Sequence, residues 1–160
     1  VGRGKSFLMD MVYDCVPATI KKRRQHFHQF MRDVHQRLDI ARKAGQADPL
    51  GLVITQLLAE VEVLAFDEMF VKDVADAMIL GRLFTGLFNK GMIVLMTTNI
   101  APDDLYKDGL QRVRFVPFID LIKTKLDVIE VAGDTDHRRM RLLGTAAYHT
   151  PLGPVATGML

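Results

Sequence analysis

The sequence predicts an α/β domain in which helices cover both faces of a mainly parallel sheet. Two short apolar runs, at 61–66 and 92–97, have the pattern of buried strands, and an amphipathic stretch at 73–90 separates them. Strands that alternate with helices in this way form parallel sheets. Hydrophobic residues make up 49% of the 160-residue chain, which is enough for a core of ordinary size.

The first part of the chain mostly shows the spacing of helices. Phe30, Met31, Val34 and Leu38 recur on one helix face, and Gly45 follows as an end signal. The elements predicted here are a helix at 6–15 with Phe7, Leu8, Met11 and Val12 on one face, a short strand at 25–30, a helix from 30 to 45, and a helix at 49–60.

After the second buried strand, the sequence predicts a turn and short helix at 102–110, a helix at 115–125 and a strand at 126–131. No repeat and no linker rich in Gly and Pro divides the chain, so we expect one domain over 1–160. Because the chain opens with Val1 in the middle of a motif, we expect that domain to be truncated at both ends.

Composition narrows the classes of partner. Lys and Arg number 21 against 19 Asp and Glu, a balance too even to imply nucleic acid or an acidic membrane as an obligatory partner. The single cysteine, Cys15, cannot form an internal disulfide, which favours a reducing compartment. The longest apolar run, Met92 to Met96, falls far short of the roughly 20 residues of a spanning helix.

The first residues of the chain match the second half of a phosphate-binding loop. Gly4-Lys5-Ser6 ends the pattern G-x-x-x-x-G-K-[ST], whose first glycine would precede Val1. Gly4 admits a close approach of phosphate to the backbone, Lys5 supplies a positive charge, and the Ser6 hydroxyl can ligate Mg²⁺. A bare G-K-S also occurs in basic turns before helices. The residues expected to bind the nucleotide are Gly2, Arg3, Gly4, Lys5, Ser6, Phe7 and Asp67.

Two acids directly follow the first buried strand. Asp67 would lie at the sheet edge and hold Mg²⁺ together with Ser6, and Glu68 would polarise a water for attack on the γ-phosphate. An acidic pair after a strand can also be a charge pair at a helix N-terminus. The order of strands and helices between Lys5 and Asp67 favours the nucleotide site.

Three further polar residues are candidates for the same site. Asn99 follows the second buried strand and is expected to orient the attacking water with Glu68, although an Asn before Pro102 is also typical of a turn. Arg112 and Arg114 precede a helix, and either one is a candidate for neutralising γ-phosphate charge from a neighbouring subunit. The sequence does not choose between these two arginines.

Longer strings resemble one family. They are Val1-Gly-Arg-Gly-Lys-Ser-Phe-Leu-Met-Asp-Met, Arg23-Arg-Gln-His-Phe-His-Gln-Phe-Met31, the run from Phe66 to Leu80, Thr98-Asn99, Leu105-Tyr106, Gly109-Leu-Gln-Arg112 and the run from Arg114 to Ile119. Up to about Tyr148 the chain resembles the ZapE-like ATPases, which are AAA+ proteins of bacterial cell division with mitochondrial relatives. The resemblance implies an incomplete three-layer P-loop NTPase fold, the AAA+ core.

The resemblance also implies residue roles: Lys5 as the Walker A lysine, Asp67 and Glu68 as the Walker B pair, and Asn99 as the sensor. It implies an ATPase core that works as a homo-oligomer and is expected to form a ring. The sequence departs from the family pattern at Met69, where Phe is usual, and at His137, where the string Asp-Tyr-Arg is usual.

The function expected from these features is Mg²⁺-dependent ATP hydrolysis that regulates or remodels a protein partner, such as a division protein. The expected location is cytoplasmic, or on the matrix side of mitochondria for a eukaryotic relative, with peripheral membrane association left open. One alternative is a nucleotide-gated assembly module with incidental turnover. A second, a metabolite kinase, is disfavoured because Glu68 suits water as the nucleophile. A chain without the first loop glycine is expected to bind ATP poorly and not to turn it over.

A pair of histidines and a basic run lie outside the predicted nucleotide site. His26 and His28 alternate on the predicted strand and share a face, but no residue with suitable spacing completes a metal site with them. The basic run from Lys21 to Arg24 has no adjoining aromatic platform, so it is interpreted as a solvated start of a strand and not as a nucleic-acid patch.

Overall fold

The computed structural model describes residues 4–131. Gly2, Arg3, His137 and the end of the predicted 1–160 domain lie outside that range. Residues Ser6–Ile129 form one compact body. The remaining described residues belong to a separate unit; they are Gly4, Lys5, Glu130 and Val131. The architecture below is that of the Ser6–Ile129 body.

A three-stranded parallel sheet forms the centre of this body. Its strands are β1 (Lys22–His26), β2 (Val63–Asp67) and β3 (Ile93–Met96), in the spatial order β1-β2-β3. The register pairs His26 with Asp67 and Phe66 with Met96. Since all three strands run in the same direction, their carboxyl ends meet at one edge of the sheet.

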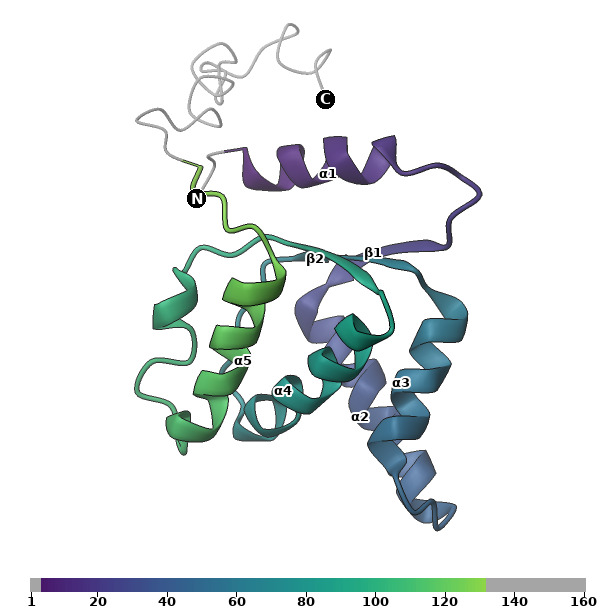
Figure 1. Cartoon of the computed structure of the whole chain (residues 1–160). Helices are drawn as coiled ribbons and strands as arrows, with labels where there is room; N and C mark the ends of the chain where they lie inside the picture. The colour runs from purple at the N-terminus through teal and green to yellow at the C-terminus, as the bar shows by residue number, and fades with distance from the viewer. Residues whose placement is uncertain (1–3, 132–160) are drawn as a thin grey trace, which may run out of the picture. The chain divides into compact units, whose positions relative to one another are not determined.

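Helices cover both faces of this sheet, as predicted. Figure 1 shows α1 on one face and the other helices on the opposite face. The helices are α1 (Lys5–Cys15), α2 (Phe27–Lys43), α3 (Pro49–Glu60), α4 (Val74–Asn89) and α5 (Arg112–Lys125), with a short 3₁₀ helix, η1, at Pro102–Asp104. The predicted α/β class with three layers is therefore confirmed. No helix within residues 4–131 combines the length and apolar character needed to cross a bilayer.

The core lies between β2 and the helices α2 to α5. Residues Val63 to Phe66 of β2 are all buried, which explains why this strand is apolar without alternation. Aromatic rings run through the core in edge contacts of 4.7 to 6.2 Å between centroids, from α2 through β2 to α4 and α5. These rings belong to Phe30, Phe66, Phe84, Phe118 and Phe115.

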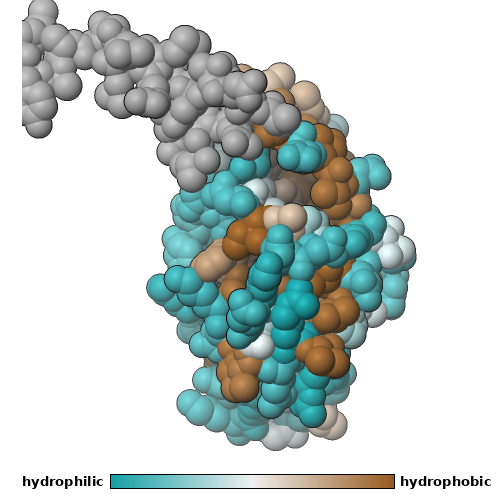
Figure 2. Space-filling model, turned by 90° about the vertical axis from the view of Figure 1, so that its left-hand side faces the viewer, coloured by the Kyte–Doolittle hydropathy of each residue, from teal (hydrophilic) through white to brown (hydrophobic). Residues whose placement is uncertain are grey.

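The surface mixes apolar and polar side chains. On the face in Figure 2, apolar residues are interspersed with polar ones. Helix α1 differs from the expectation, because Phe7, Leu8, Met11 and Val12 are all exposed and only Met9 is buried. The apolar face predicted for this helix is present in the sequence but is not part of the core of the described body.

The strand predicted at 25–30 is wrong, because the strand is β1 at Lys22–His26 and Phe27 already begins α2. The alternation of His and Phe imitates a strand, but Phe27, Phe30, Met31 and Val34 follow helical spacing and are all buried. The true strand is polar because each of its charged side chains contacts an opposite charge or a carbonyl.

Two further predictions at the end of the body need correction. The helix predicted at 115–125 begins three residues earlier, at Arg112. The strand predicted at 126–131 is wrong, since these residues form no strand in the described part of the chain. A strand needs a neighbouring strand for its backbone hydrogen bonds, and none of β1 to β3 pairs with this segment.

The side chains of the basic run at the start of β1 form hydrogen bonds with neighbouring elements. The ammonium of Lys22 donates to the carbonyls of Tyr13 and Val16 at 2.8 and 2.9 Å, at the C-terminal end of α1, where a cation is favoured. Lys21 donates to the carbonyl of Ala59 at 2.9 Å. The run is therefore a set of fixed contacts, in contrast to the solvated start of a strand that the sequence suggested.

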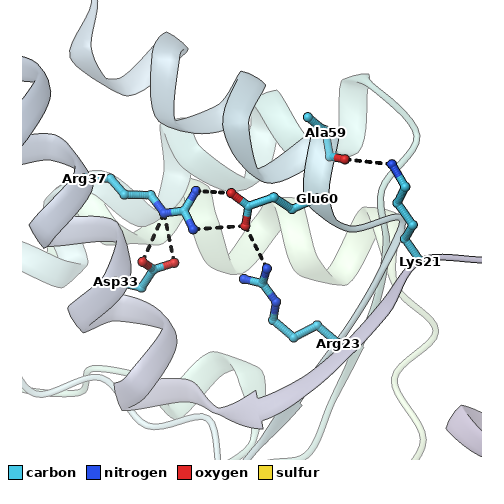
Figure 3. A network of polar contacts seen from close by, with 6 residues as sticks. All are labelled: Lys21, Arg23, Asp33, Arg37, Ala59 and Glu60. Carbon is cyan, nitrogen blue, oxygen red and sulfur yellow. Dashed lines mark hydrogen bonds and ion pairs between the residues drawn. The ribbon is translucent and has the colours of Figure 1, made fainter.

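Arg23 belongs to an ion-pair network that ties β1 to α2 and α3 (Figure 3). Glu60, the last residue of α3, accepts from Arg23 at 2.7 Å and from both terminal nitrogens of Arg37 at 2.6 and 3.0 Å. Nε of Arg37 also donates to both carboxylate oxygens of Asp33, each at 3.0 Å. Bidentate contacts of this kind are stronger than single surface ion pairs.

These contacts change the titration of Glu60. Hydrogen bonds from Arg37 and then Arg23 lower the pKa of Glu60 from 4.5 to about 2, against a smaller opposing effect of burial. A carboxylate with a lowered pKa in the folded state stabilises the fold above its unfolded pKa, and that contribution is lost as the pH falls toward the folded pKa.

We predict that Glu60→Gln lowers the free energy of unfolding at pH 7 by about 1 kcal/mol, a value reduced for the 37% exposure of the Glu60 side chain. The variant should lose less stability than the wild type between pH 5 and pH 2. Urea unfolding at several pH values measures both effects. Asp39→Asn, which removes a 3.6 Å i,i+3 pair with Arg42 on an exposed part of α2, is the control and should change neither.

Candidate functional site

The carboxyl ends of β2 and β3 meet the first turn of α1. Asp67 is the last residue of β2, and Ser6 is the second residue of α1. The Ser6 hydroxyl donates a hydrogen bond to Oδ1 of Asp67 at 2.9 Å. The structure thus brings together two residues that are far apart in the sequence and that both carry a predicted metal role.

The chemistry of this pair fits a magnesium ion. When the Ser6 hydroxyl donates its hydrogen to Asp67, the lone pairs of its oxygen remain free to ligate a cation. Mg²⁺ prefers oxygen ligands, keeps several waters and is commonly bound by one or two protein groups plus phosphate. No cluster of three His, Cys, Asp or Glu side chains occurs in the described residues, so the phosphates of a nucleotide would have to complete such a site.

Thr97 is the residue that shapes the end of β2, and sequence reasoning missed it. Its hydroxyl donates to Oδ1 of Asp67 at 2.9 Å and accepts from the backbone N–H of Glu68 at 3.1 Å. Its backbone N–H donates to the carbonyl of Phe66 at 3.0 Å, and its carbonyl accepts from the N–H of Met69 at 2.8 Å. Thr97 is 92% buried, so these bonds are largely shielded from water.

Glu68 adopts a backbone conformation that is unfavourable for a residue with a side chain. Its φ of 55° lies in the left-handed region, which costs on the order of 1–3 kcal/mol for a non-glycine residue. The turn is held in place because Thr97 accepts hydrogen bonds from the N–H groups of Glu68 and Met69. The side chain of Glu68, the residue that follows Asp67, is exposed to solvent.

Arg24 is a second residue that sequence reasoning missed. Nη2 of its guanidinium lies 3.2 Å from Oδ2 of Asp67, and Nε lies 2.7 Å from Oδ1 of Asp10. Arg24 therefore connects β1, β2 and α1. The sequence placed it in a basic run without a specific partner, and only the pairing of β1 beside β2 reveals its contact with the site.

The surroundings of Asp67 favour its ionised form. Burial would raise the pKa of this carboxyl, but hydrogen bonds from Thr97 and Ser6 and the charges of Arg24 and His26 outweigh burial and lower the pKa below its ordinary value. Asp67 is thus an anion at neutral pH, as a ligand of a metal ion must be.

The predicted loop residues are placed only in part. Gly4 has a φ of +81°, a conformation that glycine adopts at little cost, and an added Cβ would meet no atom within 4 Å. Backbone conformation, and not crowding, thus accounts for glycine there. Lys5 begins α1 but lies outside the Ser6–Ile129 body, so its contact with phosphate stays a prediction. Phe7 is 66% exposed, and Gly2 and Arg3 lie outside the described residues.

The other candidates are not in contact with Asp67. Asn99 is exposed, two residues beyond Thr97, and its side chain has no hydrogen bond within the described residues. Arg112 is half-buried and donates to the carbonyl of Asp103 in η1. Arg114 is exposed and has no ion pair or hydrogen-bonded side chain within residues 4–131. The predicted roles of these residues stay predictions.

His26 and His28 do not share a strand, because His26 ends β1 and His28 lies in the first turn of α2. Their rings stack with centroids 5.6 Å apart and an angle of 19° between planes. Within the described residues no third ligand joins them. The stack lies next to Asp67, since His26 pairs with Asp67 in the register of the sheet.

Comparison with known proteins shows the family of the chain. A model of the AFG1-like ATPase family matches residues 1–159. The chain belongs to this family. The family is named for ATPase activity, and the resemblance to ZapE-like proteins seen in the sequence is confirmed.

Curated relatives come from bacteria and eukaryotes. The chain is 46% identical to the cell division protein ZapE of Escherichia coli K12 over 152 residues, which cover 95% of the chain. It is 41% identical, over 94% of its length, to an uncharacterized protein of Schizosaccharomyces pombe. It is also 41% identical, over 86% of its length, to lactation elevated protein 1 homolog B of Danio rerio.

The chain spans only part of the length of these relatives. The matched region covers 40% of the Escherichia coli protein, 34% of the Schizosaccharomyces pombe protein and 29% of the Danio rerio protein. No solved structure matches the chain. The matches therefore show the family of the chain, and not the activity or partners of the whole protein.

We predict that Thr97→Val destabilises the full-length protein by about 1–3 kcal/mol, because Asp67 loses a donor and the N–H of Glu68 loses its acceptor inside the fold. Thr97→Ser keeps the hydroxyl and should retain most of the stability. Thr98→Val is the control, since the Thr98 hydroxyl accepts only from the nearby N–H of Ile100. Equal melting temperatures for Thr97→Val and Thr98→Val would contradict the assigned role.

Proposed function

We propose that the protein binds ATP with Mg²⁺ and hydrolyses it to ADP and phosphate. The observation that carries the proposal is the 2.9 Å hydrogen bond from Ser6 to Asp67, which places a hydroxyl and an anionic carboxylate together at the start of a helix. The free N–H groups of a helix N-terminus favour an anion such as phosphate. The family match to ATPases supports the same reaction.

Each residue has a task in this proposal. Ser6 and Asp67 hold the magnesium ion, which neutralises charge on the β- and γ-phosphates when bound. Lys5 contributes its positive charge to the phosphates. Glu68, exposed beside Asp67, accepts a hydrogen bond from the attacking water and orients it. Asn99 is proposed as a second residue that orients this water.

The proposed role in the cell is to couple hydrolysis to regulating or remodelling a protein partner. The relative from Escherichia coli carries the name of a cell division protein, which favours a partner in division for a bacterial member and a cytoplasmic location. The alternative, a nucleotide-gated assembly module with incidental turnover, uses the same binding residues. A metabolite kinase is less well supported, because the exposed Glu68 suits water as the acceptor.

Substitution of Glu68 separates these functions. We predict that Glu68→Gln lowers kcat for ATP hydrolysis by about 10²–10⁴-fold and leaves ATP affinity unchanged, since the amide cannot activate water. Phosphate release and equilibrium binding of a fluorescent ATP analogue in the full-length protein measure the two effects. Full turnover in the variant would contradict the assigned role of Glu68.

The same variant distinguishes hydrolysis from gating. If partner function is lost while ATP binding and assembly survive, turnover itself is required and the gating alternative fails. If partner function persists, the gating alternative is favoured. Phosphate delivered to an acceptor other than water would favour the kinase.

Between the two arginines, the structure favours Arg114 as the one that acts across a subunit interface. Arg112 is held against η1 by the carbonyl of Asp103, and its Nε is buried without a partner in the described residues. Arg114 is exposed two residues later on α5. We therefore assign Arg112 to fixing the start of α5 and Arg114 to a neighbouring subunit of a homo-oligomer.

We predict that Arg114→Ala lowers ATP turnover on the order of 10³-fold without changing stability. Arg112→Ala should instead lower the melting temperature. A mixture of Arg114→Ala and Glu68→Gln subunits should regain activity, because an intact site in the first can receive the arginine of the second. No recovery in mixed oligomers would contradict an action between subunits.

A further inference from the structure

We propose that Arg24 is a positioning residue that blocks divalent metal ions from Asp67 until a nucleotide delivers them. The inference deepens the proposed function and rests on it, since it takes Asp67 as the residue beside the magnesium ion. Its basis is the contact of the guanidinium with Oδ2 of Asp67 at 3.2 Å.

Both oxygens of Asp67 already have partners in the structure. Oδ1 accepts from the hydroxyls of Ser6 and Thr97, each at 2.9 Å, and Oδ2 contacts Arg24. The Asp67 side chain is only 14% exposed, so little of the carboxylate faces water. A metal ion that approaches this carboxylate must therefore compete with a positive charge already in place.

Charge explains why a free metal ion competes poorly. A guanidinium is always protonated in a protein, so Arg24 cancels the charge of Asp67 at every physiological pH. A divalent cation without phosphate gains little attraction from this neutralised pair, and it is repelled by the guanidinium. A nucleoside triphosphate adds several negative charges at the start of α1, so that a divalent cation is attracted to the site despite the guanidinium.

Asp10 gives Arg24 a second anchor. Nε of Arg24 lies 2.7 Å from Oδ1 of Asp10, which is closer than Nη2 lies to Asp67. Asp10 follows Ser6 by one turn of α1. Arg24 can therefore give up its contact with Asp67 and keep its bond to α1. Its side chain is 37% exposed, so water can replace the lost contact.

The neighbouring basic residues of β1 do not contact Asp67 in the described structure. Arg23 contacts Glu60 at the end of α3, and Lys22 contacts the carbonyls at the end of α1. Among the basic residues of β1, Arg24 is the one whose side chain touches Asp67 in the described structure. Arg23 is thus a matched control: the same residue type on the same strand, with a partner away from the site.

The test is binding of Mn²⁺ alone to the nucleotide-free, full-length protein, followed by electron paramagnetic resonance. We expect Arg24→Gln to bind free Mn²⁺ about fivefold more tightly than the wild type, the effect of removing one partly exposed ion pair. Arg23→Gln should match the wild type. In an Asp67→Asn background, Arg24→Gln should give no gain, which assigns the effect to Asp67 and not to other surface sites.

A second variant keeps the test decisive if Arg24→Gln does not fold. Asp10→Asn leaves Arg24 with Asp67 as its one acidic partner in the described residues, so free Mn²⁺ should bind more weakly than in the wild type. Asp14→Asn removes the same charge from the same helix, where Asp14 is exposed, and should have a smaller effect. Equal effects of these two variants would overturn the inference.

The outcomes separate this inference from the proposed function. If the wild type and Arg24→Gln bind free Mn²⁺ equally while both bind Mn²⁺ with ATP, the role of Arg24 is overturned and the nucleotide site stands. If neither protein binds Mn²⁺ even with ATP, the proposed function fails, and the inference fails with it. Tight binding of free Mn²⁺ by the wild type also overturns the inference.

Discussion

The carboxylate of Asp67 connects three separate parts of the fold. It receives the hydroxyl of Ser6 from α1, the hydroxyl of Thr97 after β3 and the guanidinium of Arg24 from β1. Each donor comes from a different element, so these contacts exist only when the sheet has its order and register. The full set of contacts to this largely shielded carboxylate at the end of β2 therefore depends on the correct fold.

The composition of β1 follows from its position beside this anion. Edge strands expose backbone groups that can pair with other chains, and charged side chains protect them from doing so. In β1 these charges also have specific partners: Lys22 closes the end of α1, Arg23 reaches Glu60, and Arg24 reaches Asp67. The strand is polar because electrostatic contacts with three elements, in place of apolar burial, fix it to the fold.

The sequence predicted the features that depend on local patterns of residues. It missed the contacts that depend on which strands lie side by side. Helical spacing and apolar runs predicted the α/β class and most elements, and motif spacing selected Ser6 and Asp67, which the structure places in contact. Thr97 was overlooked because it looks like any polar residue after a strand, and its role depends on lying opposite Asp67 across β2 and β3. Arg24 was overlooked because a basic run does not reveal the partner of each basic side chain. The strand β1 was misplaced because the alternation of His and Phe after it imitates a strand.

The strained turn at Glu68 contains two neighbouring acids that differ in their surroundings. A positive φ costs free energy, and Thr97 offsets part of this cost through bonds to the N–H groups on either side of the turn. The consequence is that neighbouring acids face different environments: Asp67 is shielded and paired with donors, whereas Glu68 is exposed. In the proposed function, this turn leaves Asp67 to hold the metal ion and Glu68 to orient water.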